Sequence, residues 1–68
     1  MRLLEHLERV AGDGQAPRRA AYVRSRAGEV QAHIKRLRRF AALKAGRVQD
    51  IVNARADELE RRLAAVLT

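Results

Sequence analysis

The fold is decided by residues 23–66, which read VRSRAGEVQAHIKRLRRFAALKAGRVQDIVNARADELERRLAAV. Apolar residues recur through this stretch at an average of about 3.6 positions, the period of an α-helix, and the pattern never changes to the alternation of a β-strand. Ala, Leu, Arg and Glu dominate the composition, which also favours helix. We call the recurring apolar residues the apolar stripe: Val23, Ala27, Val30, Ile34, Leu37, Ala41, Ala45, Val48, Val52, Ala56, Leu59, Leu63 and Val66.

Gly46 leaves the path of this helix open. Lys44, Ala45 and Gly46 resemble a helix C-terminus, with a cation in the last turn and a glycine after it. The stripe nevertheless keeps its phase across the glycine, and no Ser, Thr, Asp or Asn stands where a following helix would take its N-terminal cap. We therefore favour a continuous or kinked helix, with a tight turn near Gly46 as the alternative.

The N-terminal residues 1–11 predict a separate short amphipathic helix, because Leu3, Leu7 and Val10 share one helical face. Two glycines around Asp13 then favour a loop, and Pro17 suits the first turn of a new helix. The predicted fold is all-α and a single small domain: a helix at 1–11, a loop at 12–16, and one long helix or two helices broken near 46 over 17–67. This amounts to a helical hairpin or a small three-helix bundle.

The chain is short enough that assembly with another chain is expected. With 68 residues and 13 alanines among its hydrophobic residues, it has little material for a core, and it has no cysteine for a disulfide. We expect a homo-oligomer or a subunit of a larger complex, held through the apolar stripe and its widened shoulder. The predicted partner interface consists of Val30, Ile34, Leu37, Phe40, Val48, Ile51, Val52, Leu59 and Leu63.

Positive charge is concentrated in the middle of the chain. Residues 17–47 carry ten Arg and Lys side chains against one acid, Glu29, within a chain of formal net charge +7. Several mobile cations on one helix face are what phosphate contacts require, and nothing in the sequence indicates base-specific recognition of DNA or RNA. We predict a non-enzymatic helical subunit that binds nucleic acid through backbone phosphates. The predicted contacts are Arg18, Arg24, Lys35, Arg36, Arg38, Arg39 and Arg47.

Three other readings of the same cations stay open. The chain would instead be a structural or adaptor subunit, as in a phage particle or an inhibitor complex, whose basic residues contact an acidic protein surface. Ala42, Gly46 and Val52 occupy positions that resemble a helix-turn-helix, although Arg47 stands where that motif usually has an aliphatic residue. Cations opposite an apolar face also suit a helix at a membrane surface, although there is no Trp.

Catalysis, cofactors and metals are not indicated. The chain has one Ser and no Cys, and Ser25 has no base at a helical spacing that would activate it. Glu29 and His33 share a helix face, but a metal needs a third ligand and none is suggested. No apolar run reaches the roughly 18 residues of a membrane-spanning helix, and the lack of cysteine fits a reducing cytoplasm, which we take as the expected location.

Overall fold

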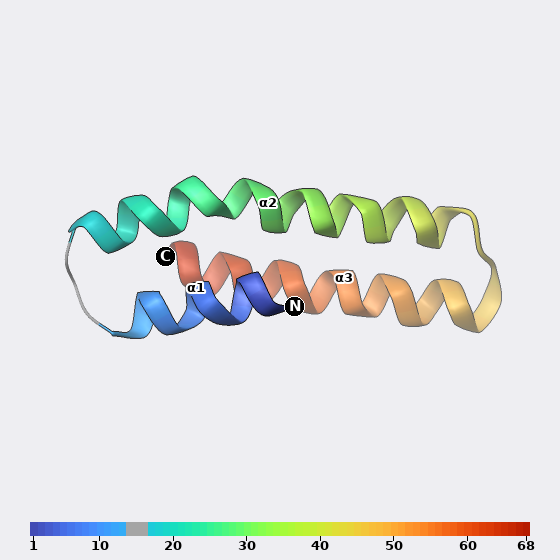
Figure 1. Ribbon diagram of the computed structural model, residues 1–68. Helices are drawn as coiled ribbons and strands as arrows, with labels where there is room; N and C mark the ends of the chain where they lie inside the picture. Colours follow the sequence, from blue (N-terminus) through green and yellow to red (C-terminus); the bar gives the residue numbers. More distant parts are fainter. Residues whose placement is uncertain (14–16) are drawn as a thin grey trace.

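The structure is a computed structural model that describes residues 1–13 and 17–68; the side chains of residues 17 and 18 are also outside the description. The described residues form three α-helices and no strand (Figure 1). The helices are α1 (Arg2–Gly12), α2 (Pro17–Ala42) and α3 (Gly46–Leu67). The predicted all-α fold is confirmed, in its three-helix form. The predicted loop at 12–16 begins one residue later, at Asp13, and its residues 14–16 lie outside the described residues.

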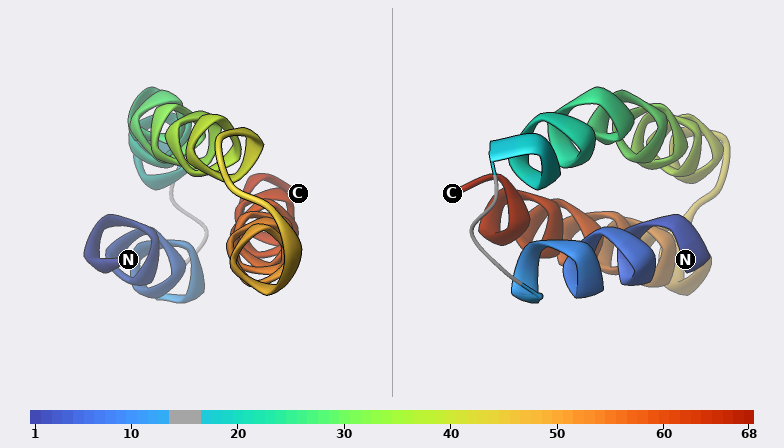
Figure 2. Two further views of the ribbon diagram at one scale, coloured as in Figure 1. Left: turned by 90° about the vertical axis from the view of Figure 1, so that its right-hand side faces the viewer. Right: turned by 60° about the vertical axis from the view of Figure 1, so that its left-hand side comes forward.

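The two long helices form an antiparallel hairpin, and α1 lies in the groove between them at one end (Figure 1). Viewed along the hairpin, the three helices stand at the corners of a triangle (Figure 2). The molecule measures 44 × 18 × 16 Å, and α1 begins about half-way along its length. In the described part of the chain, the half of the hairpin that ends in the α2–α3 turn therefore consists of two helices alone.

The core lies where the three helices meet. Residues of the stripe on α2 and α3 face each other, and the leucines of α1 close the third side. A fully buried Leu or Val contributes about 1.5–3 kcal/mol relative to an exposed one, so this small cluster supplies most of the stabilisation. Its buried members are Leu4, Leu7, Val23, Ala27, Val30, Ile34, Ala56, Leu59 and Leu63.

Of the two alternatives at Gly46, the chain takes the tight turn, and the continuous helix favoured from the sequence is wrong. α2 ends at Ala42, and Gly46 opens α3 with a φ of 62°. This left-handed conformation is open to glycine because it has no Cβ to clash with the neighbouring carbonyl oxygen. The stripe therefore folds back on itself, and its two halves become the facing sides of one core.

The end of α2 is satisfied by groups from outside the helix. The carbonyl oxygen of Ala41 accepts a hydrogen bond from the amide of Lys44 at 3.0 Å and another from the Nε2 of Gln49, in the first turns of α3, at 3.1 Å. Carbonyl groups at a helix C-terminus lack partners within the helix and need such donors. Gln49 thus ties the start of α3 to the end of α2.

Polar contacts fix α1 in its groove. The Nε of Arg62, on α3, donates to Oε2 of Glu8 at 3.1 Å, and Nη2 of the same guanidinium donates to Oε1. On the other side, the Nε2 of His6 and the Oη of Tyr22, on α2, are hydrogen-bonded at 3.2 Å. Both long helices therefore hold α1, which adds to the burial of Leu4 and Leu7.

Candidate nucleic-acid interface

The outward face of α2 carries a row of free cations. Arg24, Lys35, Arg36 and Arg39 all have exposed side chains, and none forms an ion pair with an acid in the described part of the chain. On the helical wheel they lie opposite the buried positions Val23, Ala27, Val30 and Ile34 of the same helix. We call these four residues the α2 cation row. It faces solvent because the opposite side of α2 is held in the core.

The α2 cation row extends along the helix. Lys35 and Arg39 are one turn apart, as are Arg36 and Arg39, so the Cβ atoms of each pair are about 5–6 Å apart. Arg24 precedes Lys35 by three turns, roughly 16 Å along the axis. Between them the outermost positions hold the small exposed residues Ser25, Gly28 and Ala32, with the exposed Gln31 and Glu29 to either side.

Arg38 does not belong to this row. Its Nη2 lies 2.9 Å from an Asp57 carboxylate oxygen and 2.9 Å from a Glu60 carboxylate oxygen, both on α3. The hydrogen bonds that the Arg38 guanidinium donates to these two carboxylates raise its pKa. The prediction that Arg38 projects freely toward a partner is therefore wrong, because the turn brings the acids of α3 back beside it. Its charge serves to join the two helices of the hairpin.

Two further predicted contacts stand apart from the row. Arg47 is exposed in the first turn of α3, beyond the turn from the end of the row. Arg18 lies in the first turn of α2, and its side chain is outside the described residues. The structure thus gathers four of the seven predicted contacts on one face, and places a fifth at the end of the hairpin.

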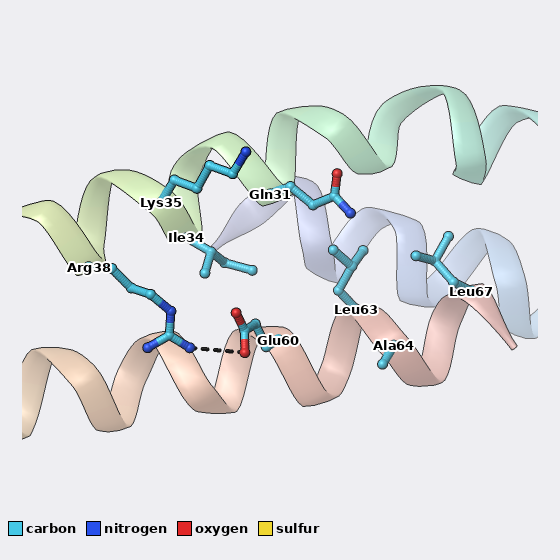
Figure 3. Close-up of a pocket in the computed structure, with 8 residues that line it drawn as sticks. All are labelled: Gln31, Ile34, Lys35, Arg38, Glu60, Leu63, Ala64 and Leu67. Atoms are coloured by element: carbon cyan, nitrogen blue, oxygen red, sulfur yellow. Dashed lines mark ion pairs between the residues drawn. The ribbon is translucent and has the colours of Figure 1, made fainter.

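A shallow hollow lies between α2 and α3, on the side away from α1 (Figure 3). Ile34 and Leu63 form its floor, and the Arg38–Glu60 ion pair crosses one end of it (Figure 3). Because the guanidinium is already paired there, the hollow offers an anion only the ammonium of Lys35, at its edge. The hollow follows the line of contact between α2 and α3 and borders the α2 cation row at Lys35.

The predicted partner interface divides into two groups. Val30, Ile34, Leu59 and Leu63 are buried in the core of the single chain, so they offer no surface to a partner. The sequence predicts a partner for them because an unbroken helix would extend beyond the reach of the short N-terminal helix. The remaining members lie in the two-helix half of the hairpin, where Leu37 and Val52 are partly buried and three are exposed: Phe40, Val48 and Ile51.

The predicted partner interface omits two residues at this end. Leu43, in the turn, is 83% exposed, more than any other large apolar side chain in the described residues. The ammonium of Lys44 lies 5.1 Å from the centre of the Phe40 ring, a cation–π contact. The break after Ala42 is the signal that would have found both, since it converts stripe-flanking residues into an exposed turn.

The helix-turn-helix and metal alternatives find no support in the geometry. A helix-turn-helix joins its helices at about 90–120°, whereas α2 and α3 run side by side in opposite directions (Figure 1). Glu29 forms an ion pair with Arg26 at 3.0 Å. The described residues contain no group of three His, Cys, Asp or Glu side chains placed to hold a metal ion.

Comparisons with known proteins do not assign the chain to a family. No protein-family model, curated protein or solved structure matches the chain. Among the described helices, none is both long enough and apolar enough to cross a membrane. The function is therefore inferred from the surface residues of the three-helix bundle.

Proposed function

We propose that this protein binds nucleic acid through backbone phosphates, with the α2 cation row as the contact surface. The observation that carries the proposal is that Arg24, Lys35, Arg36 and Arg39 share one solvent-facing helix surface with no acidic partner in the described residues. Free guanidinium groups bind phosphate oxygens in a bidentate manner and release condensed counterions from the nucleic acid. Arg47 extends the contact at the turn end of the hairpin.

The character of this face favours phosphate over an acidic protein surface. A stable protein interface has an apolar centre that becomes fully buried. The outermost positions of α2 between Arg24 and Arg36 hold the small residues Ser25, Gly28 and Ala32. The exposed Glu29 is paired with Arg26, and the exposed large apolar side chains of the described chain lie elsewhere. Because the residues beside the cations have small side chains, the helix can approach the nucleic-acid backbone closely, which favours binding to a polyanion.

The proposed binding does not depend on base sequence. Discrimination between bases requires side chains such as Asn, Gln or Arg at positions that reach base edges in a groove. Gln31 lines the hollow between α2 and α3, and Gln49 bonds to the end of α2. The α2 cation row and Arg47 contact backbone phosphates, so duplexes of different sequence are expected to bind alike.

The test is a salt series. Fluorescence anisotropy of a labelled random-sequence duplex DNA, titrated with the protein from low to moderate salt, is expected to give a linear fall of log affinity against log salt. Four phosphate contacts correspond to a slope of about −3.6. Polyglutamate of matched charge serves as the control, and is expected to compete weakly. Absence of binding at low salt, or equal competition by polyglutamate, would contradict the proposal.

A further inference from the structure

The groove that α1 fills continues beyond it without an occupant in the described chain. Tyr22 and Arg62 are the residues of α2 and α3 whose side chains bond to α1. Phe40 follows Tyr22 by five helical turns, and Ile51 precedes Arg62 by about three, so both point to the side on which α1 lies. We call this empty continuation the tip groove; its lining is Leu37, Phe40, Val48, Ile51 and Val52.

The tip groove is apolar and open. Phe40 is 47% exposed, Val48 49% and Ile51 59%, although each follows the pattern of the buried stripe or its shoulder. Three such side chains on the same side of the hairpin, in so small a protein, indicate an interaction site rather than the isolated apolar residues that any surface carries. From Ile34 to the end of α2 the groove runs for about 12 Å, room for about two turns of helix.

Cations flank the apolar side chains at regular positions. Arg36 and Lys44 stand four residues before and after Phe40, and the Lys44 ammonium lies over the Phe40 ring. Arg47 and Arg55 stand four residues before and after Ile51. Residues four apart are neighbours on a helix face. Arg55 is already paired with Glu58 at 3.0 Å, so in the described residues the α3 edge offers Arg47 as its free cation, whereas the α2 edge offers Arg36 and Lys44.

The chain itself shows what such a groove accepts. α1 is an amphipathic helix of 11 residues that buries Leu4 and Leu7 between α2 and α3. It also places the Glu8 carboxylate on Arg62, at the edge of the same groove. Apolar side chains on the inner face and a carboxylate at the edge are therefore sufficient to seat a helix here.

We propose that the tip groove binds a short amphipathic helix of a partner protein, with leucine-like side chains on one face and carboxylates along both flanks. The leucines would cover Phe40, Val48 and Ile51 and complete the three-helix bundle along its whole length. The carboxylates would pair with the cations at the edges. A second copy of this chain is a poor occupant, since it would bring Arg36, Lys44 and Arg47 against the same three cations.

The probe is a labelled peptide of about three helical turns with leucines on one face and glutamates on both flanks. Binding to the full chain is measured by fluorescence anisotropy. A peptide with lysine in place of every glutamate is the control, and is expected to bind at least tenfold more weakly. Equal binding of the two peptides would overturn the role of the cations, and no binding of the acidic peptide would overturn the proposal.

Two protein variants locate the binding. Phe40→Ala combined with Ile51→Ala is expected to weaken peptide binding at least tenfold while leaving the fold and duplex DNA binding unchanged, because both side chains are exposed and uncharged. Leu67→Ala, which truncates an apolar side chain 40% exposed at the far end of the hairpin, is the matched control and is expected to bind like the original chain. Unchanged binding in the double variant would overturn the proposal.

The remaining outcomes separate other occupants. Sedimentation equilibrium showing a dimer that Ile51→Ala dissociates would assign the tip groove to a second copy and contradict the proposal. Displacement of the peptide by duplex DNA, together with loss of DNA binding in the double variant, would assign the groove to nucleic acid and contradict the proposal. Absence of DNA binding with retained peptide binding would leave this proposal standing and remove the proposed function. Phe40 and Ile51 test the tip groove alone, whereas Arg36 and Arg47 border both surfaces.

Discussion

Arg62 on α3 and Glu8 on α1 form a two-pronged ion pair across 54 positions of sequence, with Nε donating to Oε2 at 3.1 Å. The hydrogen bonds from the guanidinium lower the pKa of the Glu8 carboxyl from its usual 4.5. The pair stands at the edge of the groove in which α1 lies. It therefore couples the docking of α1 to pH.

A carboxyl whose pKa is lower in the folded chain than in the unfolded one stabilises the fold when it is ionised. This stabilisation is fully present above the usual pKa of about 4.5 and is lost as the pH falls through the lower folded value. Glu8→Gln is expected to reduce stability modestly at neutral pH and to flatten its decline below pH 4.5. Urea unfolding at several pH values checks this; an unchanged pH profile in the variant would contradict it.

Substitution by alanine is expected to change stability in opposite directions at two glycines. Gly28 lies within α2, and a Cβ there would meet no atom within 4 Å, so Gly28→Ala should stabilise the fold by about 0.5–1 kcal/mol. Gly46 also has open space, but its φ of 62° strains any side chain, so Gly46→Ala should destabilise by about 1–2 kcal/mol. Thermal unfolding of the two variants measures the difference. Stabilisation by both would mean that the helix runs through position 46.

Leu59 is fully buried and belongs to the cluster that joins all three helices. Leu59→Ala is expected to cost about 2–5 kcal/mol, through lost burial and the cavity left behind. In a chain this small, that loss should leave much of the population unfolded at 37 °C. Leu43→Ala, at the exposed turn, is the control and should unfold like the original chain. A wild-type melting curve for Leu59→Ala would exclude the packing described.

Arg38→Gln separates structural arginines from free ones. Because Arg38 pairs with Asp57 and Glu60, its removal should lower thermal stability slightly and leave the salt slope of duplex DNA binding unchanged. Circular dichroism melting and anisotropy titrations on one preparation measure both quantities. A slope reduced by about 0.9 would show that Arg38 contacts phosphate.

Much of the fold was predictable from the pattern of apolar residues. The helix predicted at 1–11 is found at Arg2–Gly12, and the stripe residues Val23 to Ile34 and Ala56 to Leu63 are buried as their spacing indicated. These predictions succeeded because helical period and burial are properties of local sequence in an amphipathic helix. The solvent-facing position of the α2 cation row was predictable from the same helical period.

The turn at Gly46 was not predictable by that route. Ala45 and Val48 stand at the spacing of the apolar stripe, yet both are exposed. The unbroken spacing across Gly46 therefore does not reflect burial of these residues. The turn is supported by the Gln49 side chain bonding to the Ala41 carbonyl, a contact that exists only after the chain has folded back. The pairing of Arg38 with acids on α3 was hidden for the same reason. Both depend on tertiary structure, which periodicity does not encode.

The most direct test of the account compares two variants of equal charge. Lys35→Gln, Arg36→Gln and Arg39→Gln together remove three cations from the α2 cation row, whereas Arg2→Gln, Arg9→Gln and Arg61→Gln remove three exposed cations from α1 and α3. The measurement is the salt slope of duplex DNA affinity by fluorescence anisotropy. We predict a slope shallower by about 2.7 for the first variant and nearly unchanged for the second. Equal slopes for the two variants would show that net charge alone, and not the outward face of α2, governs binding.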